Sequence, residues 1–208
     1  MPHAPSILRL PARLSVILGA ALVALFALPA AAHAGTCAGT ATKQVFKTFG
    51  DNAYYSIAPN GHFESGTSGW SLTSSSVVTG NETFKVRSAS DSKSLAIQPK
   101  GLAVSPPICV GVEHPTFRFF ARRTTGTWGV INVKLRWTDS GGRTNETVVG
   151  SISGDPYKSW KPSPAYPLAT TLPLWQAGQT LSVRLVFDLE DYGGAFTIDD
   201  VYIDPYRR

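Results

Sequence analysis

The sequence predicts an all-β protein, a two-sheet antiparallel β-sandwich preceded by a cleaved signal peptide. Three observations lead to this fold class. After residue 34, no segment of ten or more residues has the periodicity of a helix. Several short segments alternate apolar and polar residues, and turn-forming residues separate these segments. Because each alternating strand has one apolar face, two sheets are needed to bury those faces against each other.

The first 34 residues have the three-part pattern of a secretory signal peptide. A basic start with Arg9 and Arg13 precedes an uncharged apolar run over residues 16–32. A membrane anchor is the alternative, but the run is short for a hydrocarbon layer of about 30 Å and contains a proline. We therefore expect cleavage after Ala34 and a protein that is extracellular or lies at the cell surface.

The mature chain, residues 35–208, has 174 residues and a net charge of +3, from 17 basic and 14 acidic residues. This length suits one domain. We expect an N-terminal extension over residues 35–58 and the β-sandwich over residues 59–208. The mild, dispersed charge argues against nucleic acid as a partner, and no later apolar segment is long enough to span a membrane. We expect a monomer.

The two clearest strands cover residues 131–138 and 181–188. In the first, the residues that share the apolar face are Ile131, Val133, Leu135 and Trp137. In the second, they are Leu181, Val183, Leu185 and Phe187. Shorter segments rich in β-branched or aromatic residues predict further strands at 94–98, 116–121 and 147–152. Turn-forming residues lie between the strands, at 59–61, 79–81, 140–142 and 192–194.

Residues 155–174 differ from the rest because they contain five prolines. Proline cannot donate a hydrogen bond to a β-ladder, so this segment predicts an irregular loop or a cover over a sheet edge. Its aromatic residues Tyr157, Trp160 and Tyr166 have two interpretations: they plug one end of the sandwich, or they form a ligand-binding surface. Trp160 follows Lys158 and Ser159 and precedes Lys161, and this polar stretch predicts an exposed indole.

The last strand carries an irregularity in its apolar pattern. Phe196 and Ile198 are in phase with each other, whereas Val201 and Ile203 are shifted by one residue. A regular strand cannot bury all four residues on one face, because a shift of one residue reverses the faces. The pattern predicts a β-bulge at residues 199–200, which restores the register and redirects a carboxylate.

Cys37 and Cys109 are the two cysteines of the chain. Export would place them where disulfides persist, so we expect them to pair and to tie the N-terminus to the middle of the chain. Two free thiols are the alternative. No Cys-Xaa-Xaa-Cys motif or Cys/His cluster predicts a zinc site.

Two motifs lie at the ends of the predicted domain. The first is Asn-Gly-His-Phe-Glu at 60–64, followed by Gly69 and Trp70. The second is Ile-Asp-Asp-Val-Tyr-Ile at 198–203. Together they bracket most of the mature chain, and they resemble the opening and closing motifs of galactose-binding-like β-jelly-roll domains, a fold of many secreted carbohydrate-binding modules. The chain is also similar to exported proteins of high-GC bacteria, which implies no activity.

The resemblance implies a structural Ca²⁺ ion held by Glu64 and by Asp199, with Asp200 as the alternative to Asp199. Calcium prefers several carboxylate and carbonyl oxygens, which a bulge can present. The alternative is that these carboxylates accept hydrogen bonds from backbone amides. The family often has Asp where this chain has His62, so no role passes to that side chain, and we expect Trp70 to lie in the core.

The mature chain contains no recognisable catalytic motif. The sequence Gly-Ser-Ile-Ser-Gly at 150–154 places Ile152 where a nucleophile would stand. A glycosidase needs two suitably spaced carboxylates, and Glu82, Glu113, Glu146, Glu190 and Asp191 lie in no such motif. We expect a protein that is not an enzyme.

The sequence and the resemblance together predict a secreted, non-catalytic module that binds an extracellular or cell-envelope polysaccharide. One candidate surface is the outward face of the strands, with Arg118, Asn132, Lys134, Arg136 and Arg184. If the strands are neighbours, this basic face suits uronic acids or phosphate groups; a solvated sheet face is the alternative. The other candidate is the loop with Tyr157, Trp160 and Tyr166. A structural or adhesive envelope protein that binds other proteins is the alternative function.

Overall fold

The computed structural model describes Met1, Cys37 and residues 41–205. The chain divides into two units, Met1–His33 and Ala34–Arg208, and every described strand belongs to the second. Apart from Met1, the predicted signal peptide lies outside the described residues. Within those residues, no helix combines the length and the apolar character needed to cross a membrane.

Eleven strands and three short 3₁₀ helices form the regular structure of the described residues. The strands are β1 (Ser56–Ile57), β2 (Ser71–Thr79), β3 (Lys93–Val104), β4 (Ile108–Gly111), β5 (Thr116–Arg123), β6 (Val130–Thr138), β7 (Thr144–Ser153), β8 (Lys161–Pro162), β9 (Tyr166–Pro167), β10 (Thr180–Leu189) and β11 (Phe196–Ile203). The helices are η1 (Lys47–Phe49), η2 (Asp155–Tyr157) and η3 (Ala169–Thr171). The strands predicted from alternation and from β-branched or aromatic content are confirmed as β3, β5, β6, β7, β10 and β11.

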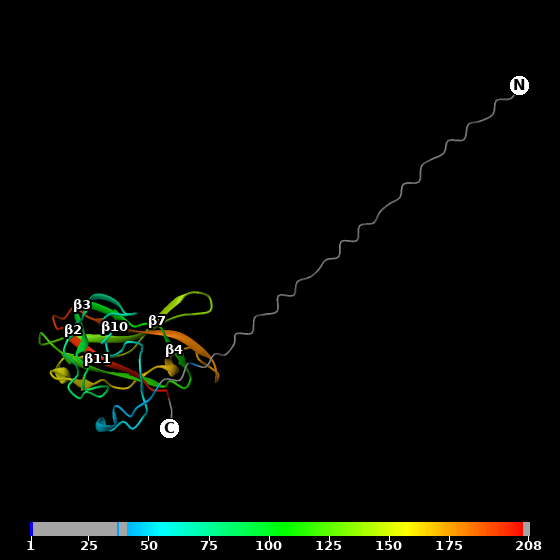
Figure 1. The fold of residues 1–208 in the computed structure, drawn as a ribbon. Helices are drawn as coiled ribbons and strands as arrows, with labels where there is room; N and C mark the ends of the chain where they lie inside the picture. Colours follow the sequence, from blue (N-terminus) through cyan, green and yellow to red (C-terminus); the bar gives the residue numbers. More distant parts are fainter. Residues whose placement is uncertain (2–36, 38–40, 206–208) are drawn as a thin grey trace. The chain divides into compact units, whose positions relative to one another are not determined.

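The strand pairs of the described residues are antiparallel, and seven strands form the order β7-β6-β10-β3-β11-β5-β8. The other four strands, β1, β2, β4 and β9, each pair with one strand of this order. Strand β3 is long enough to serve both halves of this order: its residues 95–97 pair with β11, and its residues 102–104 pair with β10. Strand β2 follows β3 along its length, and β4 pairs with β10. The sheet therefore curls around β3, as Figure 1 shows.

The two halves of the curled sheet face each other across one apolar core. Strands β5 and β10 are three places apart in the hydrogen-bonded order, yet the rings of Phe119 and Phe187 lie 4.9 Å apart between centroids. Trp70 packs against Phe63 and Phe187 in the same core, which confirms its expected burial. This arrangement is the predicted two-sheet antiparallel β-sandwich.

The bulge predicted in the last strand is present. The pairing of β11 with β5 shifts between Asp199 and Tyr202, and Asp200 has a φ of 48°. Asp is among the few residues other than Gly that adopt this left-handed conformation readily. As a result, Phe196, Ile198, Val201 and Ile203 all lie in the main core.

A second, smaller core covers the outward face of β5 and β11. Phe120 of β5 and Tyr202 of β11 point away from the main core and pack with Val45, Phe46 and Tyr55 of the N-terminal segment. The ring of Phe46 stacks on Phe120 at 5.3 Å and meets Tyr202 edge-on at 5.9 Å. Every residue of β11 is consequently buried.

The cysteine pairing is confirmed, because Cys37 and Cys109 form a disulfide with their Cα atoms 5.5 Å apart. The proline-rich segment covers a sheet edge, as predicted. Strands β8 and β9 both pair with β5, and Ser163 between them donates its backbone N–H to the carbonyl of Phe119.

Candidate ligand-binding surface

The predicted basic face exists in part, since β6 and β10 are neighbours. The register places Arg136 of β6 directly opposite Arg184 of β10. Lys134 is two residues before Arg136 and therefore lies on the same outward face of β6. Asn132 lies on the same face, opposite Asp188. Arg118 belongs to β5, in the other half of the sheet.

The face is not uniformly basic, which corrects the prediction. The Nζ atom of Lys134 lies 2.7 Å from Asp188 and 3.3 Å from Glu146, and Arg136 lies 2.7 Å from Glu146. The hydrogen bond to Asp188 is the main reason that the pKa of Lys134 is raised above its usual value, against the effect of burial. Asn132 donates to Glu190. Acidic residues of β7 and β10 therefore offset much of the positive charge.

Arg118 binds other parts of the fold and is not free to bind a ligand. Its Nη1 atom lies 2.7 Å from Oδ2 of Asp51, and two further guanidinium nitrogens donate to the carbonyl of Ser163. The guanidinium also lies over the ring of Phe46, 4.5 Å from its centroid. Arg118 thus joins the N-terminal segment and the proline-rich segment to β5.

The aromatic residues of the proline-rich segment are buried, so the expected exposure of Trp160 is wrong. Tyr157, Trp160 and Tyr166 are 8%, 4% and 4% exposed. Tyr157 and Tyr166 belong to the main core, and Trp160 belongs to the second core, with the guanidinium of Arg122 over its ring at 5.1 Å. The flanking lysines point outward while the indole faces β5, because the segment lies along the edge of that strand.

An open groove occurs at the C-terminal end of β6, on the outward face. Its volume is about 510 Å³. The side chains around it come from five strands and one connection, and they are Ser71, Val104, Pro107, Arg136, Trp137, Thr138, Thr144, Ser182 and Arg184. Two of the predicted ligand-binding residues, Arg136 and Arg184, therefore meet in one groove.

A second groove has a volume of about 460 Å³ and shares Trp137 with the first. It is lined by Trp137, Asp139, Asn145, Thr170, Thr171, Leu172, Pro173 and Trp175. Trp175 is 82% exposed, the highest value for any large apolar side chain in residues 41–205. Sequence reasoning did not single out Trp175; the signal available was a tryptophan next to the turn-forming sequence Gln-Ala-Gly at 176–178.

The turn that presents Trp175 is held by its own hydrogen bonds. The backbone N–H groups of Trp175 and Gln176 both donate to Oε1 of Gln179, at 2.7 and 3.0 Å. The backbone N–H of Gln179 donates in return to the carbonyl of Gln176. The indole is therefore exposed on an ordered turn, and binding would not require the turn to form first.

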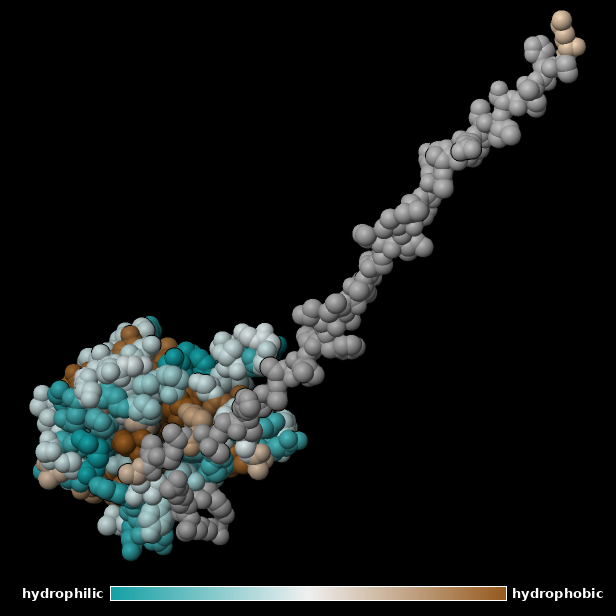
Figure 2. Space-filling model, turned by 45° about the vertical axis from the view of Figure 1, so that its right-hand side comes forward, coloured by the Kyte–Doolittle hydropathy of each residue, from teal (hydrophilic) through white to brown (hydrophobic). Residues whose placement is uncertain are grey.

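Exposed apolar side chains are otherwise scattered. On the face drawn in Figure 2, hydrophilic surface separates the apolar areas from one another. The other large apolar residues of the 41–205 region that are exposed are Tyr54, Phe84, Val112, Trp128, Val148 and Tyr192.

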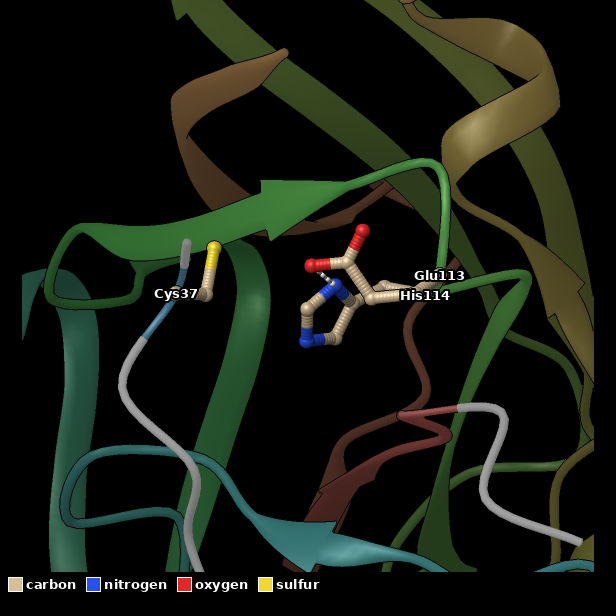
Figure 3. Close-up of side chains that lie close together, drawn as sticks. All are labelled: Cys37, Glu113 and His114. Atoms are coloured by element: carbon tan, nitrogen blue, oxygen red, sulfur yellow. Dashed lines mark ion pairs between the residues drawn. The ribbon is translucent and has the colours of Figure 1, made fainter. Parts of the chain in front are cut away.

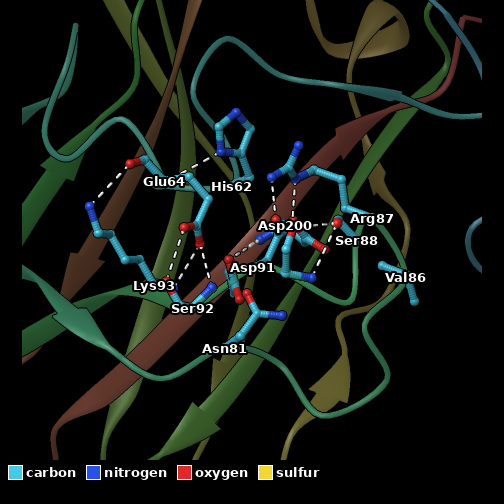
Figure 4. A network of polar contacts seen from close by, with 12 residues as sticks. His62, Glu64, Asn81, Val86, Arg87, Ser88, Asp91, Ser92, Lys93 and Asp200 are labelled. Atoms are coloured by element: carbon cyan, nitrogen blue, oxygen red, sulfur yellow. Dashed lines mark hydrogen bonds and ion pairs between the residues drawn. The ribbon is translucent and has the colours of Figure 1, made fainter.

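The bulge of β11 lies beside a cluster of buried carboxylates. Asp199 and Asp200 are fully buried, and Glu82 and Asp91 of the 80–92 loop are 1% and 7% exposed. Asp199 accepts hydrogen bonds from the backbone N–H groups of Glu82 and Asp200 at 2.9 and 2.8 Å. Arg87 pairs with Asp91 through two nitrogens. Figure 4 shows Arg87, Asp91 and Asp200 together.

Burial and mutual repulsion raise the pKa values of these acids. Burial is the largest cause for Asp199, whose pKa rises to about 9, and the charge of Asp200 adds to it. Burial followed by the charges of Glu82 and Asp91 raises the pKa of Asp200 to about 7. Burial also raises the pKa of Glu82, although backbone amides, including that of Val86, oppose it.

The cluster contains buried oxygens without a hydrogen bond of good geometry. Within the described part of the chain, neither carboxylate oxygen of Asp200 accepts a hydrogen bond of good geometry, and neither does Oδ1 of Asn81. The backbone N–H and the charge of Arg87 are near enough to lower the pKa of Asp200, but burial and the charges of Glu82 and Asp91 outweigh them. Such oxygens are costly to bury unless something satisfies them. Carboxylate and amide oxygens are the ligands that Ca²⁺ prefers, so the residues present fit this ion.

Glu64, the other predicted calcium ligand, accepts hydrogen bonds from backbone amides. Its Oε1 atom accepts from the N–H groups of Ser92 and Lys93, both at 2.8 Å, and its Oε2 atom accepts from the Ser92 hydroxyl (Figure 4). Burial disfavours ionisation, but these hydrogen bonds outweigh it and lower the pKa of Glu64. Its role as a calcium ligand stays a prediction.

A further group of potential metal ligands, Cys37, Glu113 and His114, lies near the disulfide (Figure 3). Cysteine ligates a metal as its thiolate, and the sulfur of Cys37 is instead bonded to that of Cys109. His114 instead accepts a hydrogen bond from the backbone N–H of Gly111 and lies 3.4 Å from Glu113. This group therefore does not form a metal site.

No family model matches the chain, and no curated protein matches it. Among solved structures, the CBM22-1 and GH10 modules of endo-1,4-beta-D-xylanase 10B from Clostridium thermocellum, complexed with xylohexaose, match with a TM-score of 0.50 and 13% identity. That match covers 69% of this chain and 27% of the other, so this chain spans about a quarter of its length.

Two smaller proteins match over nearly their whole length. A xylan-binding domain from CBM 22 is 14% identical, with 76% of this chain and 99% of that one covered and a TM-score of 0.47. The family 11 carbohydrate-binding module of Clostridium thermocellum is 15% identical, with coverages of 72% and 94% and a TM-score of 0.46. At 13% identity, the match to the modules of xylanase 10B shows the fold alone. The chain has the β-jelly-roll fold of carbohydrate-binding modules, as the sequence motifs implied.

Proposed function

We propose that this protein is a secreted, non-catalytic module that binds polysaccharide. The observation that carries the proposal is the exposed Trp175 beside Trp137 in an open groove, on a chain with the fold of carbohydrate-binding modules. The disulfide between Cys37 and Cys109 supports an extracellular location, since disulfides persist in oxidising compartments.

The groove combines the two kinds of group that hold a sugar. An indole ring offers a rigid apolar face on which a pyranose ring can stack, at low cost in side-chain entropy. Hydroxyl and amide groups of Thr170 and Asn145 line the same groove and can bind sugar hydroxyls. Asp139 already accepts three hydrogen bonds within its turn, from the N–H groups of Gly141 and Arg143 and from Asn145, so it also fixes the groove wall.

The carboxylates near the grooves support binding without cleavage. Glycoside hydrolysis uses a pair of carboxyl groups on either side of the scissile bond. Of the described residues that line the two grooves, Asp139 alone carries a carboxylate, and its hydrogen bonds, first that from Asn145, lower its pKa. Glu146, on the adjacent strand face, is occupied by Arg136 and Lys134.

A glycan array followed by affinity electrophoresis of the purified protein tests this function. We expect retention by at least one polysaccharide, and we expect Trp175→Ala to weaken it by about tenfold or more, as the loss of a central aromatic contact does in other interfaces. Trp128→Ala is the matched control: Trp128 is 54% exposed but lies just before the opposite end of β6. Retention of no glycan by the wild-type protein, or equal effects of the two substitutions, contradicts the proposal.

We also propose that Asp200 and Asn81 hold a Ca²⁺ ion, with the neighbouring acids Asp199, Glu82 and Asp91 contributing negative charge. The proposal is supported by the oxygens of Asp200 and Asn81 that accept no hydrogen bond of good geometry from the described residues. The ion would satisfy those oxygens and keep the buried carboxylates ionised. The site lies outward of β11 and on the opposite half of the sheet from the two grooves, so its role would be to stabilise the fold.

A further inference from the structure

Arg136 and Arg184 form an unfavourable pair of like charges, of which the fold neutralises only one. The two residues lie directly opposite each other on β6 and β10. Like charges in directly opposite positions destabilise a sheet. Glu146 lies 2.7 Å from Arg136, so only one of the two guanidinium groups has a carboxylate partner.

Arg184 donates a hydrogen bond to a neutral group. Its Nη1 atom donates to the carbonyl of Ser105 at 2.8 Å, and among the described residues Arg184 forms no ion pair. The guanidinium has five N–H groups, so several remain free for a ligand. The contact with Ser105 holds the side chain at the groove, which the two arginines line together.

Lys134, the neighbouring cation on the same face, has carboxylate partners that Arg184 lacks. Lys134 lies between two carboxylates, Asp188 at 2.7 Å and Glu146 at 3.3 Å. No acidic side chain of the described residues lines the 510 Å³ groove that holds the arginines. The positive charge of Arg184 therefore has no carboxylate partner at the groove, whereas the charges of Lys134 and Arg136 are paired.

We infer that this groove binds an oxyanion carried by a polysaccharide, so that the ligand is an acidic glycan; this inference rests on the proposed polysaccharide-binding function. Arginine matches the planar geometry of a carboxylate and binds sulfate or phosphate esters through the same N–H groups. Hydroxyl groups of Thr138, Thr144 and Ser182 also line the groove. Because Trp137 lines both grooves, a chain with its acidic residue at the arginines can place a neighbouring sugar ring at Trp175.

The test compares glycans that differ in charge and in the kind of anion. Polygalacturonate and alginate supply carboxylates, chondroitin sulfate supplies sulfate esters, teichoic acid supplies phosphate, and xylan and galactan are neutral. We expect the wild-type protein to bind at least one acidic class more tightly than both neutral glycans. We expect Arg184→Gln to weaken that binding roughly ten- to hundredfold and to leave binding of neutral glycans unchanged, the range typical of lost hydrogen bonds to a charged group.

Two further variants keep the result interpretable. Arg136→Gln removes the other arginine without touching the bond to Ser105, and we expect a loss in the same direction even if Arg184→Gln unfolds the protein. Lys47→Gln removes an exposed positive charge on the N-terminal segment and is expected to leave the affinity unchanged within about twofold, because exposed charges contribute little. Equal losses with all three variants would show non-specific attraction and overturn the inference.

The failure of this inference differs from the failure of the proposed function. If neutral glycans bind at Trp175 as tightly as acidic ones, the function stands and the acidic ligand is wrong. If the wild-type protein retains no glycan of any class, the function itself is wrong and this inference falls with it.

Discussion

The outward faces of the two halves of the sheet differ in what covers them. Outward from β5 and β11, the N-terminal segment and the 80–92 loop bury Phe120, Tyr202 and two aspartates. Outward from β6 and β10, Lys134, Arg136 and Arg184 remain partly exposed and line or adjoin an open groove. Both faces belong to strands that alternate inward and outward residues, so alternation alone does not determine which face is covered.

The difference follows from the chemistry of the outward side chains. An aromatic side chain that points outward exposes a large apolar area unless another segment packs on it. A charged side chain is already stable in water and loses hydration when covered. The covered face therefore contributes to stability, and the open face remains available for a ligand.

The largest effect on the free energy of unfolding is expected on the covered face. The same substitution, Trp to Ala, is made there and on an exposed turn. Trp160→Ala should lower the free energy of unfolding by about 3–5 kcal/mol, since it removes a buried indole from the second core. Trp175→Ala, the same change at a residue 82% exposed, should cost less than about 0.5 kcal/mol. Urea unfolding of both variants gives the comparison. Similar losses at the two positions would show that the second core is not packed as described.

The carboxylates under the covered face should make stability depend on pH and on calcium. The folded-state pKa values of Asp200 and Asp199, about 7 and about 9, lie above the value of about 3.9 for an unfolded chain. Folding then favours the protonated forms, so in EDTA the contribution of these groups is fully present below pH 4. It decreases as the pH rises above 4, and the loss is complete once the pH exceeds the folded-state pKa values of about 7 and about 9. Each pH unit over which a group is ionised only in the unfolded chain costs roughly 1.4 kcal/mol.

Calcium should reverse this loss by binding the ionised form. At neutral pH, millimolar Ca²⁺ should raise the melting temperature of the wild-type protein, because a ligand that binds only the folded state stabilises it. Asp200→Asn should abolish the calcium response, whereas Asp188→Asn on the open face should retain it. Thermal melts from pH 4 to 9, with EDTA or with Ca²⁺, measure both effects. A melting temperature that calcium does not change would contradict the proposed ion.

A small effect is also expected at the ion pairs of the open face. Lys134→Met removes a cation from its pairs with Asp188 and Glu146, whose side chains are 36% and 31% exposed and can be hydrated instead. The free energy of unfolding should change by about 1 kcal/mol or less, as for most ion pairs near a surface. Denaturant unfolding at low and high salt checks this value. A loss as large as that of Trp160→Ala would mean that the open face is also part of the stabilising structure.

Part of the candidate ligand-binding surface could be predicted from the sequence. Alternation placed Arg136 and Arg184 on the outward side of their strands, and the structure brings them together because β6 and β10 pair. The same reasoning included Arg118, which the N-terminal segment engages through Asp51. It missed Trp175, because the exposure of a single tryptophan in a loop depends on what packs beside it.

The sequence by itself determined the features that depend on neighbouring residues along the chain. These are the strands, the bulge at Asp199 and Asp200, and the pairing of the two cysteines, since side-chain period, register and the number of possible partners are all local or countable. Only the tertiary structure decided that Trp160 is buried and Trp175 exposed, and that Glu82 and Asp91 lie near Asp200. Burial depends on which distant segment covers a face, and the periodicity of a strand contains no information about that segment.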